Sequence, residues 1–371
     1  MNVGGRRSYL ESIVLGEDQG FYSWVIRGFL LPLSLIYRAG LAIYLRIYAL
    51  GLRKRYRLSV PVVCVGNLTF GGSGKTPTVG AVCGILAAHG MSVVVLSRGH
   101  GGSARGSLIV SDGQKILCKS SESGDEPMML AKTLSGVPVI VGRDRRASGR
   151  LACERFSPDV IVMDDGLQYW QLHRDLDIVV LSGARPFGSG FVMPTGDLRE
   201  PVGGLARAGA VLLTDPDTGT VDGVLKRVKS IAPRAHCFTG SRRPVRFVNA
   251  ATGEAVSLDW VKGRNIAAFC GIGKPRGFYE MLVALGARIV NWVTYPDHYA
   301  YLQTDLEAIK DSAQKVGAEA VVTTSKDLAR LDGADSIPGL WVLEIALEIE
   351  DSSNFGRFIV QTIEKQAAAA R

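Results

Sequence analysis

The part of this sequence best suited to chemistry is a glycine-rich loop that ends in lysine and threonine. Its members are Gly71, Gly72, Ser73, Gly74, Lys75 and Thr76. Glycines let backbone N–H groups converge on phosphate oxygens, while the lysine would reach the β- and γ-phosphates and the threonine hydroxyl would bind Mg²⁺. The loop therefore predicts a site for a nucleotide and Mg²⁺.

The segments that flank this loop agree with a P-loop. Residues 61–66 form an apolar, β-branched run typical of a buried parallel strand, and residues 75–89 favour a helix whose N-terminus would face the phosphates. Thr69 stands where the strict GxxxxGK[ST] pattern has glycine, although the dense glycines that follow keep the backbone flexible. The alternative is a glycine-rich turn that precedes a helix by chance.

Two carboxylates are expected beside this loop. Asp164 and Asp165 directly follow the β-type run 159–163, and an acid at the end of a buried strand can hold Mg²⁺ directly or through water. The alternative is a helix cap or a turn, because Asp-Gly is a common turn pair.

Other polar turns carry groups that phosphoryl transfer needs. A carboxylate can orient or deprotonate an acceptor hydroxyl, and arginine can neutralise the charge that develops on the γ-phosphoryl group. A neighbouring carboxylate could also tune a histidine. Taken alone, each of these turns would more often be polar surface. Their residues are Asp125 and Glu126, then Arg143, Arg145 and Arg146, and finally His298.

The elements that must position these residues alternate between short apolar runs and helical stretches, which indicates an α/β fold. We expect a three-layer P-loop NTPase-like domain at 61–240 and a smaller C-terminal α/β domain at 241–371. The polar run 236–248 contains glycine and proline and is predicted to be a linker or a short hairpin. A cleft between the two domains would hold the substrates.

The first sixty residues are predicted to be a membrane-associated helical segment. Residues 21–52 are the most apolar stretch, but three arginines interrupt it, so one or two amphipathic helices bent by Pro32 are expected at the membrane surface. Aromatic residues within the stretch and the basic cluster 53–57 suit a lipid–water boundary. The alternative is a buried pair of core helices.

Composition narrows the class of protein. The net charge of +8 favours acidic partners, although no nucleic-acid-binding motif is present and no nucleic-acid partner is predicted. The six cysteines are widely spaced and mostly lie in apolar runs, so a disulfide framework or a zinc site is not expected, and the chain should work in a reducing compartment.

Together, the motifs resemble the tetraacyldisaccharide 4'-kinase family, the lipid A 4'-kinases of Gram-negative bacteria. The likeness extends from the apolar N-terminus to about residue 330. Its motifs, in order, are VGNLTFGGSGKTP (65–77), LSRGHGG (96–102), GDEP (124–127), VGRDRRASG (141–149), DDGLQ (164–168), PFGSG (186–190), GDLREP (196–201), CGIGKPRGFY (270–279), YPDHYAY (295–301) and TSKD (324–327).

The resemblance implies a reaction and roles for residues. ATP with Mg²⁺ would phosphorylate the 4'-hydroxyl of an acylated glucosamine disaccharide at the cytoplasmic face of the inner membrane. Asp125 would accept the hydroxyl proton with help from His298, and Lys75 would act on the phosphates. The remaining implied sites are Glu126, Asp164 and Asp165 for the metal, Gln168 beside them, and Arg143, Arg145, Arg146 and Arg199 for phosphates. Tyr169 and His100 depart from the family pattern at positions that look peripheral to the chemistry.

Other functions would use the same loop. A membrane-associated P-loop NTPase that acts with a protein partner is the main alternative, and a nucleotide-switched membrane scaffold is another. A scaffold would not need Asp125 paired with His298. No obligate protein partner is inferred. If Asp125 belongs to the first domain and His298 to the second, we expect catalysis to require domain closure.

Overall fold

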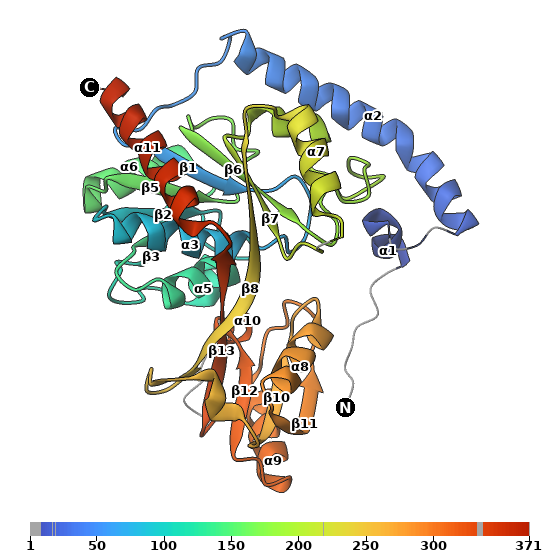
Figure 1. The fold of residues 1–371 in the computed structure, drawn as a ribbon, viewed down its shortest axis with the longest axis vertical. Coiled ribbons are helices and arrows are strands. Elements are labelled where there is room, and N and C mark those ends of the chain that lie inside the picture. Colours follow the sequence, from blue (N-terminus) through green and yellow to red (C-terminus); the bar gives the residue numbers. More distant parts are fainter. Residues whose placement is uncertain (1–8, 17, 19, 218, 332–336, 371) are drawn as a thin grey trace.

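The strands of this protein form one continuous sheet (Figure 1). The structure is a computed structural model that describes residues 9–16, 18, 20–217, 219–331 and 337–370. The strands of the half that carries the glycine-rich loop are β1 (Val62–Gly66), β2 (Val93–Ser97), β3 (Leu108–Ser111), β4 (Val139–Val141), β5 (Val160–Asp164), β6 (Leu176–Ser182) and β7 (Ala210–Thr214). The strands that follow are β8 (His236–Asn249), β9 (Ala255–Val256), β10 (Asn265–Cys270), β11 (Arg288–Thr294), β12 (Ala320–Thr324) and β13 (Leu340–Ile349). Within the described residues they lie in the order β11-β10-β12-β13-β8-β7-β6-β1-β5-β2-β4-β3, and β9 pairs with β8.

Helices cover both faces of this sheet. In the first half they are α3 (Lys75–Ala88), α4 (Ser120–Ser123), α5 (Asp125–Thr133), α6 (Arg145–Phe156), the 3₁₀ helix η1 (Val202–Arg207) and α7 (Val221–Ile231). The other helices precede or follow this half in the sequence. They are α1 (Tyr9–Leu15), α2 (Phe21–Ala49), the 3₁₀ helix η2 (Leu258–Val261), α8 (Pro275–Ala284), α9 (Gln303–Lys315), α10 (Ser325–Leu328) and α11 (Ser352–Ala370).

The central strand β1 shows why its segment is apolar throughout. It pairs in parallel with β5 on one side and with β6 on the other. Val63 and Val65 pack into a core with α3, α5 and α11, while Val62 and Cys64 pack into a second core with α6 and α7. A strand buried on both faces cannot alternate apolar with polar residues. The predicted three-layer α/β fold is therefore confirmed.

The segment 236–248 is neither a linker nor a short hairpin, as its composition predicted, but most of the 14-residue strand β8. Its first residues pair in parallel with β7, and from Gly240 onward it pairs antiparallel with β13. Pro244 lies where the register of this second pairing shifts, a position that tolerates a residue without an N–H. Arg242 and Arg246 on this ribbon are exposed and form ion pairs, which explains the polar sequence.

Strands β8 and β13 join the half with the glycine-rich loop to the body drawn at the bottom of Figure 1, which contains β10, β11, β12, α8 and α9. The predicted boundary between 61–240 and 241–371 falls inside β8. Helix α11 returns to the first half, where Phe355 and Ile359 share a core with residues of α3. The division into two domains stays a prediction.

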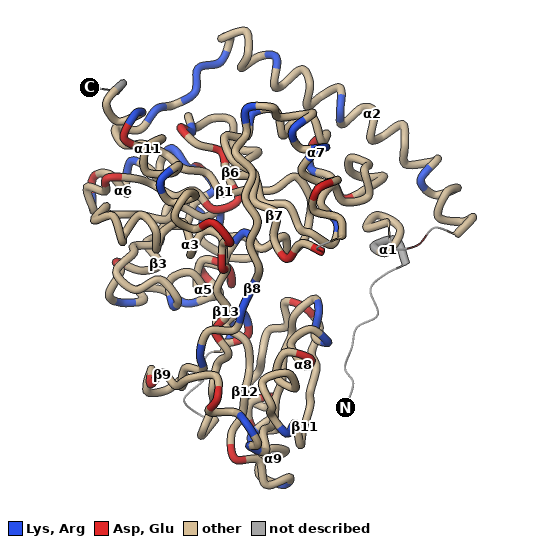
Figure 2. The backbone as a smooth tube through the Cα atoms, in the orientation of Figure 1, with Lys and Arg blue, Asp and Glu red and all other residues tan. Residues whose placement is uncertain are grey.

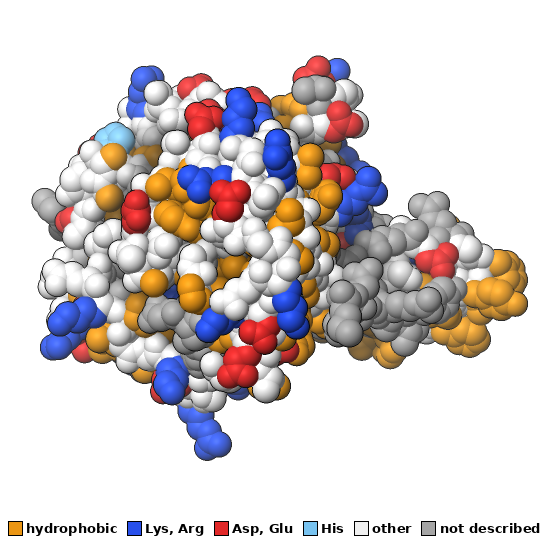
Figure 3. All heavy atoms as spheres, turned by 90° about the horizontal axis from the view of Figure 1, so that it is seen from below, with side chains coloured by type: hydrophobic (Ala, Val, Ile, Leu, Met, Phe, Trp, Pro, Cys, Tyr) orange, Lys and Arg blue, Asp and Glu red, His pale blue; other side chains and the backbone are white. Residues whose placement is uncertain are grey.

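The apolar N-terminal segment forms one 29-residue helix, α2, which continues through Pro32 and runs along the outside of the molecule (Figure 1). Its buried residues include Arg27 and Ser34, whereas Phe21 is 77% exposed and Phe29 is 80% exposed. Figure 3 shows hydrophobic side chains gathered on the projecting end of the molecule, and Figure 2 shows that the charged residues of α2 are basic. By length and composition, α2 could cross a membrane.

Candidate active site

The glycine-rich loop connects β1 to α3, so that Lys75 and Thr76 are the first residues of α3. Gly71 and Gly74 have φ angles of 100° and 87°, in the left-handed region that glycine adopts without strain. A Cβ on Gly74 would lie 3.3 Å from Cγ2 of Thr214. The course of the loop therefore requires glycine at position 74.

Gly74→Ala is expected to lower the free energy of unfolding by about 1–3 kcal/mol, because alanine would be strained at this φ. The matched control is Gly84→Ala in the same helix, where an added Cβ meets no heavy atom within 4 Å. This control should leave stability unchanged or raise it by up to about 1 kcal/mol. Urea unfolding measures the free energy of unfolding of the two variants, and equal changes in both would contradict the requirement for glycine at position 74.

Asn67, directly after β1, organises the loop. Its Nδ2 donates to Oγ of Ser73 (2.8 Å), and its Oδ1 accepts a hydrogen bond from Nζ of Lys75 (3.2 Å). The Asn67 carbonyl accepts from Nε2 of Gln168 (3.0 Å), which also donates to Oε1 of Glu200 (2.7 Å). Gln168, predicted to serve the nucleotide site, is thus placed to support the loop through Asn67.

Asp164, predicted to bind metal, is the last residue of β5 and is 1% exposed. Its Oδ2 accepts a hydrogen bond from Oγ of Ser97 (3.0 Å), which ends the neighbouring strand β2, whereas its Oδ1 has no hydrogen-bond partner among the described residues. Burial, followed by the charges of Glu126 and Asp165, raises the pKa of Asp164 to about 7. A buried, unpartnered carboxylate oxygen beside other carboxylates is an environment that a cation would stabilise.

The donors around Asp164 fit Mg²⁺. This ion prefers oxygen ligands and is usually held by one or two carboxylates together with substrate phosphates and waters. Asp164 and Glu126 supply carboxylates, and Thr76 supplies a hydroxyl at the start of α3. No group of three or more His, Cys, Asp or Glu side chains suited to a metal occurs within the described ranges.

Asp165, also predicted to bind metal, is engaged by cations of the protein. Both of its oxygens accept from Nη1 of Arg199 (2.7 and 2.8 Å), and Nζ of Lys75 lies 3.8 Å from Oδ1. Burial alone would raise the pKa of Asp165, but the charges of Lys75 and Arg199 outweigh it and lower the pKa. The backbone carbonyl of Arg199 accepts a hydrogen bond from the hydroxyl of Tyr37 in α2 (2.7 Å). Helix α2 is thus linked directly to the site.

The three predicted arginines of the 142–146 turn lie in different environments. Arg145 is 2% exposed, its guanidinium lies 5.5 Å from the centre of the Tyr169 ring, and burial lowers its pKa. Arg146 pairs with Asp144 (2.8 Å), while Arg143 is exposed. The charge of Arg145 helps to lower the pKa of Asp165, so Arg145 lies beside the acid pair, and its contact with a phosphate stays a prediction.

Asp125 and His298, which are 173 residues apart, meet in the structure. Nδ1 of His298 lies 3.3 Å from Oδ2 of Asp125, and the same oxygen accepts from Nε of Arg330 (2.7 Å). Burial favours a raised pKa for Asp125, but the hydrogen bonds from His298 and Arg330 outweigh it and lower the pKa to about 2. His298 has a φ of 61°, an unusual conformation that the surrounding loop holds. Two turns that look ordinary in sequence therefore form one polar cluster.

Sequence reasoning missed Asn67, Ser97 and Arg330 as members of the site. Asn67 and Ser97 could have been found, because both follow or end parallel strands whose carboxyl ends meet at one edge of the sheet. Arg330 carries no local signal beyond its position three residues after the TSKD motif. Its role depends on contacts with residues far away in the chain.

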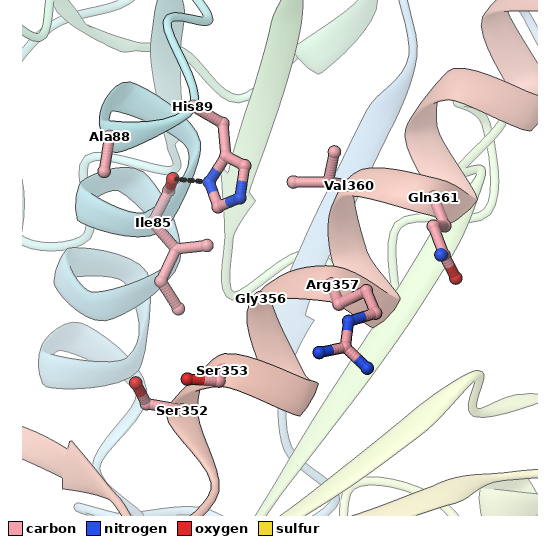
Figure 4. A pocket seen from close by; sticks show the side chains of 9 residues that line it. All are labelled: Ile85, Ala88, His89, Ser352, Ser353, Gly356, Arg357, Val360 and Gln361. Atoms are coloured by element: carbon pink, nitrogen blue, oxygen red, sulfur yellow. Dashed lines mark hydrogen bonds between the residues drawn. The ribbon is translucent and has the colours of Figure 1, made fainter.

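A cavity of about 450 Å³ lies elsewhere, between α3 and α11 (Figure 4). In this view Nδ1 of His89 donates to the carbonyl of Ile85 (2.8 Å). Both residues are at the end of α3 opposite to the glycine-rich loop, and ten residues of helix place Ile85 about 15 Å from Lys75. This cavity is separate from the site. It is lined by Ile85, Ala88, His89, Ser352, Ser353, Gly356, Arg357, Val360 and Gln361.

Comparisons with known proteins agree on what this chain is similar to. The model of the family described as tetraacyldisaccharide-1-P 4'-kinase (LpxK) matches residues 26–364. A tetraacyldisaccharide 4'-kinase of Syntrophus aciditrophicus is 37% identical over 346 residues, covering 88% of this chain and 91% of that protein. One from Anaeromyxobacter sp. (strain K) is 39% identical over 329 residues, covering 88% and 87%. The crystal structure of LpxK from Aquifex aeolicus in complex with ATP superimposes with a TM-score of 0.75 at 31% identity, covering 91% of this chain and 99% of that one.

Proposed function

The chain belongs to the tetraacyldisaccharide 4'-kinase family, and on that premise we propose which residues carry its reaction and where it works. The enzyme transfers the γ-phosphoryl group of ATP, with Mg²⁺, to the 4'-hydroxyl of tetraacyldisaccharide 1-phosphate in lipid A biosynthesis. The observation that carries the proposed roles is the contact of Asp125 with His298 near the metal and phosphate residues.

Asp125 is the proposed acceptor of the hydroxyl proton, and His298 supports it. A carboxylate with a pKa near 2 is ionised and acts first as a hydrogen-bond acceptor that orients the hydroxyl. In a loose phosphoryl-transfer transition state, orientation matters more than early proton removal, because the hydroxyl becomes acidic only as its bond to phosphorus forms. Oδ2 of Asp125 is held by Arg330, and Oδ1 accepts one long hydrogen bond from Ser120 (3.3 Å), which leaves it capacity for the substrate.

The phosphates of ATP are proposed to lie on the glycine-rich loop, with Lys75 at the β- and γ-phosphates. Bound Mg²⁺ would supply charge stabilisation at the phosphate oxygens. Thr76, Glu126 and Asp164 would hold it, and Asp164 would be the primary ligand because its Oδ1 has no other described partner. Asp165 would act chiefly by holding Arg199 and Lys75 in place, and Arg145 would complete the positive lining.

The experiment that tests this assignment is transfer of labelled γ-phosphate from ATP to tetraacyldisaccharide 1-phosphate in detergent micelles. Labelled lipid in the presence of Mg²⁺ is the expected product. ATP hydrolysis without labelled lipid would instead favour a membrane-associated NTPase that acts with a protein partner. We propose no obligate protein partner for the reaction itself.

The surface on which the enzyme works is proposed to be the cytoplasmic face of the inner membrane of a Gram-negative bacterium. On a helix that packs against a soluble protein, the apolar stripe faces the core. In α2 the residues that face inward include the polar Ser23, Arg27 and Ser34 instead. The Oγ of Ser34 bonds the carbonyl of Val192 (2.9 Å) and the hydroxyl of Thr195 (2.7 Å). The outward apolar side chains and the basic cluster 53–57 suit the boundary of an anionic bilayer.

The double variant Phe29→Glu, Ile36→Glu should lower sedimentation of the enzyme with phosphatidylglycerol-containing vesicles by more than about 10-fold. Each substitution removes an exposed apolar side chain (80% and 68% exposed) and adds a charge that the bilayer excludes. The matched control is Val283→Glu on α8, which is 49% exposed on the other half and should leave sedimentation unchanged. Equal losses of sedimentation in the double variant and in Val283→Glu would contradict the proposal that the outer face of α2 binds the membrane.

A further inference from the structure

Arg330 is a buried cation that makes several contacts, of which the proposed mechanism uses only the one to Asp125. It lies two residues after the end of α10, and only 3% of its side chain is exposed. Nη1 donates to the carbonyl of Gly271 (2.9 Å) and lies 3.7 Å from Oδ1 of Asp327, a fully buried carboxylate. These contacts fix the guanidinium within the half formed by β10–β13.

From this position Arg330 reaches across to the other half. Nε donates to Oδ2 of Asp125 (2.7 Å), the first residue of α5. On the same side, Nη2 lies 3.4 Å from Nδ1 of His298 and 3.9 Å from Oδ1 of Asp297. The rigid planar fork of arginine makes such simultaneous contacts possible, which the single ammonium of lysine cannot reproduce.

The two neighbours of Nδ1 of His298 require opposite hydrogen-bonding roles of that nitrogen. Arginine can only donate, so a hydrogen bond from Nη2 of Arg330 requires an unprotonated Nδ1. An ionised carboxylate can only accept, so a hydrogen bond to Oδ2 of Asp125 requires a protonated Nδ1. The distances of 3.4 and 3.3 Å are nearly equal, and His298 can satisfy one neighbour at a time.

We propose that Arg330 is a positioning residue of the phosphoryl-transfer site: it fixes Asp125 across the junction between the two halves, and its guanidinium holds the ring of His298 beside that carboxylate. This inference rests on the proposed roles of Asp125 and His298. The charged groups that face His298 are Asp125 from α5, Asp297 beside it, and Arg330, while Lys326 is drawn to Asp297 (2.7 Å). Without Arg330, His298 would face the carboxylates of Asp125 and Asp297, and the nearby cation Lys326 is already paired with Asp297.

The test compares Arg330→Gln with the wild-type enzyme by measuring kcat for lipid phosphorylation and the KM for ATP. In the variant kcat should fall by about 10²-fold, with the KM for ATP changed by less than threefold. In NMR spectra of ¹³C-labelled histidine, the His298 signal should shift in the variant, because Nη2 of Arg330, which lies 3.4 Å from Nδ1, has been removed.

Two further variants separate positioning from simple support of the fold. Arg330→Lys retains the charge but loses the planar fork, so kcat should fall by about 10-fold, less than in Arg330→Gln. This variant carries the test if Arg330→Gln does not fold, and wild-type kcat in it would then overturn the proposal. The matched control is Arg246→Gln, an exposed arginine paired with Glu344 (2.7 Å), which should behave as wild type.

Three outcomes would contradict either the role of Arg330 or the proposed function. Wild-type kcat in Arg330→Gln overturns the proposal. So does a lower kcat in that variant with an unshifted His298 signal, since that pattern describes structural support only. If the wild-type enzyme phosphorylates no lipid, the proposed function fails, while the His298 signal still decides whether Arg330 contacts His298.

Discussion

Lys75→Met should lower kcat for phosphoryl transfer by roughly 10²–10³-fold, the effect expected for loss of a preorganised group that stabilises developing charge. The Lys75 side chain is 9% exposed, and Nζ is held at 3.2 Å by Oδ1 of Asn67 and at 3.8 Å by Oδ1 of Asp165. The position of its ammonium group is therefore fixed before ATP binds. Methionine retains most of the side-chain volume, so the loss should appear in catalysis rather than in folding.

The measurement is labelled phosphate in the lipid together with ATP hydrolysis, and thermal unfolding shows whether the variant is folded. Lys226→Met on the exposed face of α7 is the matched control and should retain full activity. Both labelling and hydrolysis should fall in Lys75→Met. Lipid labelling within threefold of wild type would show that the phosphates do not lie on the glycine-rich loop.

The nucleotide half of the site could be predicted because its signals are local. A strand, a glycine-rich loop and a helix follow one another around Lys75, and the acid pair at Asp164 ends another apolar strand. Parallel strands bring their carboxyl ends to the same edge, so the proximity of these segments follows from the fold class. The fold class itself follows from strands such as β1 that are apolar throughout.

The remaining parts depend on contacts between distant residues. Strand β8 looks like a linker because the ribbon it forms with β13 is open to solvent, so its sequence lacks the apolar run of a buried strand. Arg330 looks like any arginine after a short helix, yet it contacts Asp125, 205 residues earlier. Asp125 and His298 were connected only by the family resemblance, since each turn alone is typical of a polar surface.

Asp125→Asn should lower kcat by about 10²–10⁴-fold, the range for removal of a group that accepts a proton in the transition state. Asparagine has nearly the same shape but cannot accept the hydroxyl proton, and its amide would face the donors of Arg330 and His298. The KM for ATP should change little, because the role proposed for Asp125 concerns the acceptor hydroxyl. Asp311→Asn on the exposed side of α9 is the control and should match wild type.

The pH dependence separates the role of Asp125 from that of Asp164. Hydrogen bonds from His298 and Arg330 hold the pKa of Asp125 at about 2, so its carboxylate is ionised at every pH from about 4 upward. Loss of activity between about pH 7 and pH 5 therefore cannot come from protonation of Asp125 and should come from Asp164, whose pKa burial raises to about 7. In Asp125→Asn the residual activity should consequently be low at every pH, whereas activity that returns to wild type at high pH would show that Asp125 only tunes a different base.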